Sequence, residues 1–358
     1  VFINRTPFYK TLYTYFPKQL PQMHCLLENK MGQPTIARFS ESGNTKIWIG
    51  LDIAEEITRY RQGDPLKVKT VSYKGGMGFE YERPTYLYND QIHSTYRTIP
   101  WADNLGYMIS KELTQLTDLP LLVPLPYGAK GLILLTGDDD QAYLDKYDEQ
   151  LKAIDGLPIT YYLHPLTKHT PETLAKMPSN VEIGVHPDAL ETPSEYYNLC
   201  TEQVNYVRKL TGKPVRTVRN HSFLNNGYWG HLKAWEENGL ELDLNIPGVD
   251  GTALNGSYLP FRVKRGDGTW TSHYSLLTTF GDGMVFALGM TDEQAAKKIR
   301  SLACRIERSN PGVLVFNFHP QNIGQTSKMH KEVVKLARRK GWYAIGMESY
   351  LNWLKMFD

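Results

Sequence analysis

The sequence predicts an α/β protein with a parallel sheet, either a barrel or a doubly wound sheet, that follows a separate amino-terminal piece. Two observations support this prediction. Short apolar runs alternate with segments of helical periodicity from position 126 to position 358. The first of these runs, 131–136, is apolar or glycine almost throughout, as expected of a strand that is buried on both faces.

Length and composition are those of an ordinary folded protein. The chain has 358 residues, with 40 Lys plus Arg against 38 Asp plus Glu and a formal net charge of +2. Because binding of nucleic acid needs a basic surface, this balance argues against a nucleic-acid partner. No apolar run reaches the roughly 18 residues that a membrane span needs. Three distant cysteines leave the redox compartment open, and we favour a secreted or periplasmic location slightly over a cytoplasmic one.

Residues 1–125 form the expected amino-terminal accessory region. Turn signals separate short extended pieces, which are expected at 35–38, 46–51 and 68–73. A strand-like segment that leads into a helical one, 47–61, weakly resembles the closing part of a flavodoxin-type domain of the glutamine-amidotransferase kind. This resemblance implies no activity. A proline-rich segment, 116–130, is expected to lead into the second domain, 126–358.

Strands and helices are expected to alternate along the second domain. After 131–136, further strands are expected at 158–163, 181–185, 214–218, 240–244, 313–318 and 342–346. Capping residues and helical spacing predict helices over 144–154, 193–210, 291–306 and 329–340, and a last short helix closes the chain.

Polar residues follow the carboxyl ends of these strands, where α/β folds place their functional sites. Asp138, Asp139 and Asp140 follow the first strand. Adjacent carboxylates repel one another unless a cation or hydrogen bonds compensate, and the other interpretation is a helix cap. Later strand ends carry histidines, namely His186, His221 and His319. One Asp with two His is a pattern typical of catalytic metal sites.

Taken in chain order, the segments 136–140 and 182–186, then Arg219 and Asp243, then 314–319 resemble the motifs of the polysaccharide deacetylase family. This is carbohydrate esterase family four, with NodB homology, and the chain is most similar to a divergent branch with His-Pro and Arg-x-His-Ser turns. The resemblance implies a distorted (β/α)7-type barrel over 126–358. It also implies a metal-dependent hydrolase of amide bonds other than peptide bonds, with zinc as the expected cofactor and an N-acetylated glycan or amino sugar as substrate.

The resemblance further implies an acid–base pair. Asp138 matches the family's general base, and His319 matches its general acid. Arg219 matches the arginine that pairs with the base and keeps it ionised. Asp243 resembles the aspartate that orients the acid histidine, although it fits a strand-end cap equally well.

A metal-ligand set is implied in the same way. Asp139 and His186 match two ligands, but the position of the family's second histidine is Leu190, which cannot bind a metal. We expect His221 to replace it, with Asp188 as a lesser candidate. Asp139, His186 and His221 should then converge on one ion.

Substrate contacts are expected from two places. His164 ends a strand, where a structural or substrate-lining role is favoured over metal binding. Tyr258, Arg262 and Trp270 fall in a long excursion between strands, 248–283, which is either a substrate-shaping loop or a β-hairpin that packs on the barrel.

Two alternatives to a deacetylase remain. One is a hydrolase of another amide or of a cyclic imide, because relatives with this fold have such activities. The other is a barrel that has lost catalysis and only binds glycans. The missing histidine at Leu190 favours the inactive barrel, whereas the presence of Asp138, Asp139 and His319 argues against it.

Overall fold

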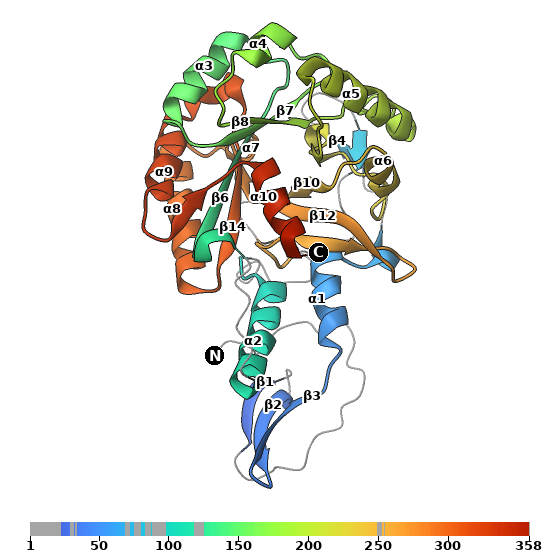
Figure 1. Ribbon diagram of the computed structural model, residues 1–358, viewed down its shortest axis with the longest axis vertical. Coiled ribbons are helices and arrows are strands. Elements are labelled where there is room, and N and C mark those ends of the chain that lie inside the picture. Colours follow the sequence, from blue (N-terminus) through green and yellow to red (C-terminus); the bar gives the residue numbers. More distant parts are fainter. Residues whose placement is uncertain are drawn as a thin grey trace.

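The structure is a computed structural model that describes residues 23–28, 32, 34–68, 72–74, 80–82, 87, 98–117, 125–248, 253 and 255–357. Its main feature is a ring of parallel strands with helices outside it (Figure 1). The strands are β6 (Gly131–Asp138), β7 (Ile159–Leu163), β8 (Val181–Val185), β9 (Thr217–Val218), β10 (Leu242–Pro247), β12 (Trp270–Thr278), β13 (Phe280–Gly281) and β14 (Gly312–Asn317). They are ordered β12-β10-β9-β8-β7-β6-β14-β13.

The continuous run 270–281 closes this ring. Its first part, β12, pairs in parallel with β10, and its last part, β13, pairs in parallel with β14. Between them, the Thr279 backbone N–H donates to Val315 O at 2.9 Å. Because one run contacts both ends of the sheet, the described strands form a distorted parallel barrel, which confirms the expected fold class.

Strand β6 is central to this barrel, and all eight of its positions are buried. It pairs with β14 along its length, with β7 near its end, and with a short outer strand, β15 (Trp342–Ala344), near its start. Apolar side chains on one face of β6 join a core cluster with the helix α10 (Met347–Leu354). Burial on both faces explains why the sequence of this strand is almost continuously apolar.

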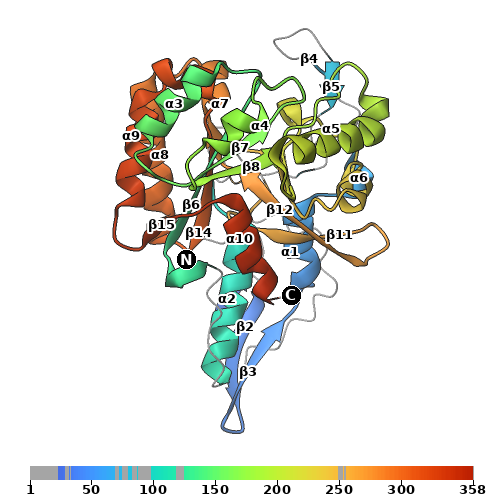
Figure 2. The ribbon, with the colours of Figure 1, turned by 45° about the horizontal axis from the view of Figure 1, so that its top comes forward.

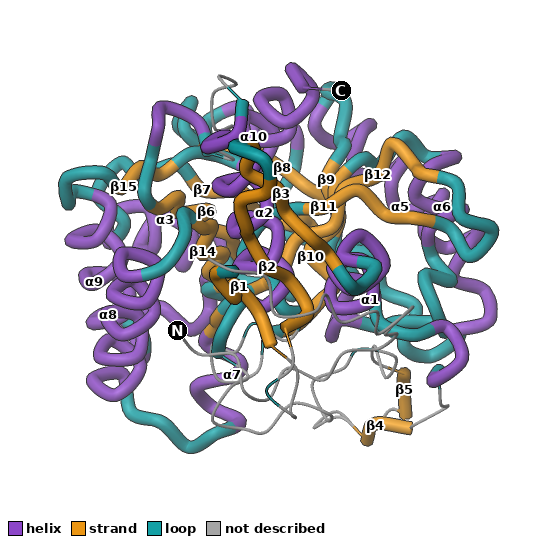
Figure 3. Tube along the Cα trace, turned by 90° about the horizontal axis from the view of Figure 1, so that it is seen from below, coloured by secondary structure: helices purple, strands orange, loops and turns teal. Residues whose placement is uncertain are grey.

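Helices surround the barrel, with α8 and α9 on one side and α5 and α6 on the opposite side in Figure 3. Besides α10, they are α3 (Leu144–Ala153), α4 (Pro171–Ala175), α5 (Tyr196–Thr211), α6 (Leu232–Glu237), α7 (Asp282–Ala287), α8 (Asp292–Arg308) and α9 (Ser327–Ala337). The expected long helices are present, whereas α4, α6 and α7 were not expected. Among the described residues, no helix combines the length and apolarity needed to cross a membrane.

The excursion 248–283 matches one of its two expected forms, a β-hairpin, but one strand of this hairpin also belongs to the barrel. The strand β11 (Phe261–Lys264) pairs antiparallel with β12, so the described part of this segment contains a β-hairpin. Its second strand is also a barrel strand, which the sequence analysis missed. The first half of β12 reads Trp-Thr-Ser-His-Tyr, and this polar stretch hides a buried strand from any search for apolar runs.

The amino-terminal part contains an antiparallel sheet that lies beyond one end of the barrel in Figures 1 and 2. Its strands are β1 (His24–Glu28), β2 (Pro34–Glu41) and β3 (Asn44–Ile49), and they share a core with α1 (Ile53–Gln62) and α2 (Trp101–Leu116). A flavodoxin-type sheet is parallel, so this pairing does not support the weak resemblance.

Other amino-terminal expectations are tested only partly. The extended piece expected at 68–73 lies mostly outside the described residues, apart from the start of a small hairpin of β4 (Ser72–Lys74) and β5 (Glu80–Glu82). Residues 118–124 of the expected linker also lie outside them. The domain boundary at position 125 therefore stays a prediction.

Polar contacts connect the amino-terminal helices to the barrel. Asp103 of α2 accepts hydrogen bonds from the Ser257 hydroxyl and from Tyr258 N at 2.7 Å, and it pairs with Arg61. The Gln62 amide exchanges two hydrogen bonds of 2.8 Å with the backbone of Lys264 in β11. Both contacts lie at the amino-terminal ends of barrel strands.

Candidate functional site

The carboxyl ends of four barrel strands bring together Asp138, His186, Arg219 and His319, as the sequence analysis expected for strands of one parallel sheet. Asp138 Oδ1 lies 2.8 Å from Arg219 Nε and 3.6 Å from His186 Nδ1. Asp138 Oδ2 lies 3.7 Å from His319 Nε2. The Asp138 carboxylate is thus the centre of the group.

Both oxygens of Asp138 are held by hydrogen bonds. Arg219, which is fully buried, donates from Nε and Nη2 to Oδ1, and Asn317 Nδ2 donates to Oδ2 at 2.8 Å. Arg219 Nη2 also donates to Asn317 Oδ1 at 2.7 Å, so the three side chains form a closed set. Burial raises the pKa of Asp138, but the charges of Arg219, His186 and His319 together outweigh it, and the net pKa is below the usual value. Asp138 is therefore ionised at neutral pH.

Asn317 was missed by the sequence analysis. It is the last residue of β14, and the register places it beside Thr136 of β6. Thr136 Oγ1 accepts a hydrogen bond of 3.0 Å from Arg219 Nη1, so both strands supply partners to the same guanidinium. A polar residue at the end of an apolar strand, two positions before His319, is the signal that could have identified it.

Asp140 lies among three histidines. Its Oδ1 is 3.2 Å from His186 Nε2 and 3.8 Å from His221 Nε2, and its Oδ2 is 3.3 Å from His319 Nε2. Asp140 and Gln141 have φ angles of 39° and 63°, in the left-handed region that L-residues seldom adopt. Such conformations cluster at functional sites, and here the turn accompanies the placement of the Asp140 carboxylate beside the histidines.

Asp139 does not join this group, which corrects the expected ligand set. One of its carboxylate oxygens accepts from the Tyr147 hydroxyl, and the other accepts from His164 N at 3.3 Å. Successive side chains of a strand point to opposite faces, so Asp139 is directed away from the side on which Asp138 lies. The place expected for Asp139 is held by Asp140.

The group around Asp140 fits a metal ion. Asp140, His186 and His221 each offer a ligand atom, and these atoms lie within 4.8 Å of one another. Among the described residues, Asp140 Oδ1 and His186 Nε2 are buried without a hydrogen-bond partner. His186 Nδ1 lies 2.6 Å from the Arg219 carbonyl oxygen, so Nδ1 carries the proton and Nε2 presents a lone pair. One carboxylate and two imidazoles are ligands that zinc binds.

His319 is held by Asp282, which the sequence analysis also missed. His319 Nδ1 lies 2.5 Å from Asp282 Oδ1, and the His319 backbone N–H donates to Asp282 Oδ2 at 2.8 Å. Burial lowers the pKa of His319, but the carboxylates of Asp282 and Asp140 outweigh it and raise the pKa well above the usual value. His319 is therefore a cation at neutral pH, with Nε2 directed toward Asp138 and Asp140.

Asp243 does not orient His319, and this expectation is corrected. It is the second residue of β10 and is fully buried. Its Oδ2 lies 3.1 Å from His273 Nε2, and its Oδ1 accepts from Asn245 N at 2.8 Å. Asp243 is a partner of His273 in the barrel wall, whereas Asp282 comes directly after the strand that the sequence analysis missed.

Tyr258, Arg262 and Trp270 lie at the other end of the barrel, so the structure does not bring them to Asp138. The Tyr258 carbonyl accepts from Val313 N, at the start of β14, and Arg262 faces Tyr274 in the first half of β12. Trp270 begins β12 beside a cavity of about 510 Å³ that α1 also lines. These side chains therefore lie near the starts of β10, β12 and β14, whereas Asp138 lies at the end of β6.

His164 lies next to Asp188, not in an open substrate groove. It is 3% exposed, and its Nε2 is 3.1 Å from Asp188 Oδ2. Asp188 Oδ2 is also 3.2 Å from His221 Nδ1. Leu190, at the position of the missing histidine, is buried, and its backbone N–H donates to Asp188 Oδ1 at 3.1 Å.

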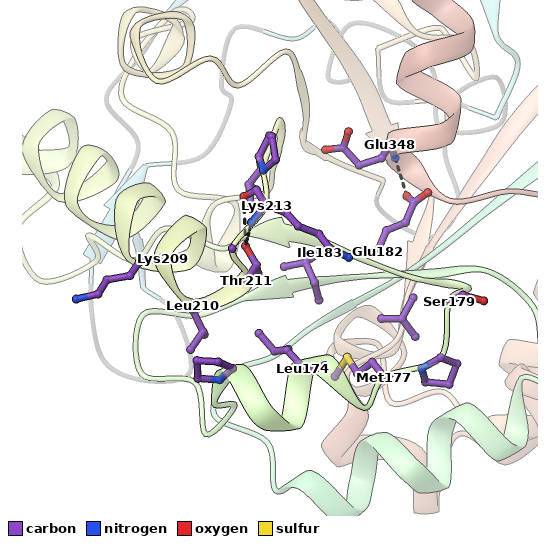
Figure 4. A pocket seen from close by; sticks show the side chains of 17 residues that line it. Leu174, Met177, Ser179, Glu182, Ile183, Lys209, Leu210, Thr211, Lys213 and Glu348 are labelled. Atoms are coloured by element: carbon purple, nitrogen blue, oxygen red, sulfur yellow. Dashed lines mark hydrogen bonds between the residues drawn. The ribbon is translucent and has the colours of Figure 1, made fainter.

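A separate groove of about 750 Å³ lies between α4, β8 and the end of α5 (Figure 4). Leu174, Ile183 and Leu210 face it, and Glu182 at its side accepts a hydrogen bond of 2.7 Å from Glu348 N. The groove lies beside the first residues of β8, which begins at Val181, whereas His186 comes directly after the last residue of that strand. It is therefore distinct from the group around Asp138.

Comparison with solved structures shows the fold of the barrel. A candidate polysaccharide deacetylase from Mycobacterium smegmatis matches with 17% identity and a TM-score of 0.52, over 66% of this chain and 94% of the other. An allantoinase matches with 13% identity and a TM-score of 0.52, over 65% of this chain and 93% of the other. No family model and no curated protein sequence matches the chain. The chain thus has the polysaccharide deacetylase and allantoinase fold.

Proposed function

We propose that this chain is a metal-dependent hydrolase that removes acetyl groups from an N-acetylated glycan or amino sugar. The observation that supports this proposal most is that His319 Nε2 lies close to the carboxylates of both Asp138 and Asp140. An ionised carboxylate and a cationic imidazole lie within 4 Å of each other and beside a group that fits a metal. Such an arrangement suits hydrolysis of an amide, which needs a base for water and an acid for the leaving nitrogen.

Asp140, His186 and His221 are the proposed metal ligands, with zinc as the leading candidate. Their donor atoms are a carboxylate oxygen and imidazole nitrogens, two of them buried without partners. When bound, a divalent cation supplies Lewis-acid polarisation of the carbonyl and lowers the pKa of water. Asp139 has no part in this set, because Tyr147 and His164 N occupy its carboxylate.

Asp138 is the proposed general base. Arg219 and Asn317 fix its orientation and favour its ionised form. The carboxylate is therefore ready to accept a proton from water. Because these partners are buried and already in place, little reorganisation is needed at the moment of proton transfer.

His319 is the proposed general acid. Asp282 accepts the Nδ1 proton, which leaves the Nε2 proton for the leaving nitrogen. An amine is a poor leaving group until it is protonated, so a cationic histidine at this point favours cleavage of a C–N bond.

The second candidate function is hydrolysis of another amide or of a cyclic imide. It is favoured by the equal TM-score of 0.52 for the allantoinase and for the candidate deacetylase. An inactive glycan-binding barrel is less well supported, because Asp138, His319 and the group around Asp140 are all present and close together.

Acetate release from N-acetylated chitooligosaccharides and peptidoglycan fragments tests the proposal, with allantoin and hydantoin opening measured in parallel. We expect acetate release that a chelator abolishes and zinc restores, and that D138N and H319A both lose. Ring opening without acetate release would support the second candidate. Absence of any chelator-sensitive hydrolysis would support a binding protein instead.

A further inference from the structure

Asp188 is fixed between two histidines in the turn after β8. Its Oδ2 lies 3.1 Å from His164 Nε2 and 3.2 Å from His221 Nδ1. Its backbone N–H donates to Gln203 Oε1, and its carbonyl accepts from Gln203 Nε2, both at 2.8 Å. With Leu190 N on its second oxygen, Asp188 is held through both its side chain and its backbone.

The tautomer of His164 follows from its neighbours. The Leu166 backbone N–H donates to His164 Nδ1 at 3.1 Å, so Nδ1 is an acceptor. In the neutral ring the proton is then on Nε2, which donates to Asp188 Oδ2. Although His164, Asp188 and His221 are close enough together to hold a metal, His164 Nε2 has no lone pair to offer in this tautomer.

His221 is the partner whose orientation matters. Its Nδ1 is buried, makes no aligned hydrogen bond in the described structure, and lies 3.2 Å from Asp188 Oδ2, within reach of a small ring rotation. A proton on Nδ1 leaves the lone pair on Nε2, the atom that lies 3.8 Å from Asp140 Oδ1. His186 shows the same pattern, with Nδ1 paired to the Arg219 carbonyl and Nε2 facing Asp140.

We propose that Asp188 and His164 are positioning residues that set the tautomer and ring orientation of His221 as a metal ligand. This inference rests on the metal site of the proposed function. Leu190 stands where the family has a histidine, and its backbone N–H holds the Asp188 carboxylate. Asp188 in turn orients His221, which follows the next strand, β9. Outer contacts of this kind fix the orientation of metal-bound histidines.

The test is zinc binding to the full chain, measured by competition with a chromophoric chelator, together with the visible absorption of the cobalt-loaded protein. We expect D188A to weaken zinc binding about 10- to 100-fold and to change the cobalt spectrum, with one ion per chain retained. H164L should weaken binding less, because Asp188 keeps its contacts to Leu190 and His221.

Matched variants separate positioning from folding. H164Q should bind zinc nearly as wild type does, because the glutamine amide nitrogen can replace Nε2 as donor to Asp188. D145A is a neutral control, because the Asp145 side chain in α3 is 68% exposed. Thermal unfolding in excess chelator should show that D188A, H164L and H164Q remain folded.

Three results would overturn the inference. The first is zinc affinity in D188A and H164L equal to that of wild type. The second is a stoichiometry of two ions that falls to one in D188A, which would make His164, Asp188 and His221 a metal site of their own. The third is a wild-type chain that binds neither zinc nor cobalt, which would also refute the metal site of the proposed function. The first two leave that function intact.

Discussion

Asp140 Oδ1 lies 3.2 Å from His186 Nε2, and among the described residues neither buried atom has a hydrogen-bond partner. Leaving a buried polar atom unpaired costs about 1–3 kcal/mol, so this pair calls for an explanation. Protonation of His186 would give an ion pair, and indeed nearby carboxylates outweigh burial and raise its pKa. A metal between the two atoms satisfies both without requiring that proton.

The first prediction separates Asp140 from its neighbour. D140A should lose zinc binding by at least about 100-fold, because it removes the only anionic member of the proposed ligand set. D139N should keep zinc binding, since the Asp139 carboxylate bonds to Tyr147 and His164 N instead. Chelator competition measures both variants. Retained binding in D140A with loss in D139N would restore the ligand set that the sequence analysis expected.

The second prediction concerns Asn317, whose side-chain amide bonds to both Asp138 and Arg219. N317L keeps the branched side-chain shape and number of heavy atoms but leaves Asp138 Oδ2 without the Asn317 donor and Arg219 Nη2 without the Asn317 acceptor. We expect a loss of about 1–3 kcal/mol in the free energy of unfolding, measured with urea. The value of kcat should fall about 10-fold or more, with zinc affinity unchanged. An unchanged kcat would show that Arg219 alone positions the base.

The third prediction is a shift in the pH dependence of activity. A general acid must be protonated, so activity is lost as pH rises through the pKa of His319, which Asp282 and Asp140 raise. D282N removes one of these charges and lowers that pKa. The alkaline limb of the kcat profile should therefore move to lower pH, while zinc affinity stays unchanged. An alkaline limb at the wild-type position would exclude His319 as the acid.

Much of the barrel could be predicted from the sequence because its strands are buried on both faces. Continuous apolar runs identify β6, β7 and β14 without any structure. The run 270–281 was not predicted as a strand because it is not continuously apolar: His273 and Ser275 are polar residues that are buried in the barrel wall. That one omission also hid Asp282, since the residue that holds His319 comes directly after this run.

The site could be predicted to the level of strand ends but not of atoms. The sequence indicates that Asp138, His186, Arg219 and His319 meet, because parallel strands end at the same side of the barrel. It does not show that the chain turns through a left-handed φ at Asp140, and this turn determines which acidic side chain faces the histidines. Conformations of this kind depend on the surrounding structure and not on local propensity.

The final prediction is independent of any metal. His231 is 1% exposed, its Nε2 donates to Leu224 O at 3.2 Å, and its ring packs on Tyr196 and near Trp235. Burial lowers the pKa of His231 to about 3, which outweighs the opposing effect of the Leu224 hydrogen bond. In the unfolded chain a histidine has a pKa of about 6.5. Between these values the unfolded state binds the extra proton, so stability is lost as pH falls.

H231Q removes this titration and keeps an amide N–H for Leu224 O. The free energy of unfolding of wild type should fall by about 1.4 kcal/mol more per pH unit than that of H231Q between about pH 6 and pH 4. At pH 8 the variant should be the less stable of the two, because it loses packing against Tyr196. The two curves should therefore converge on acidification. Urea unfolding in excess chelator at several pH values measures the slopes, and parallel curves would show that His231 is protonated in the folded state.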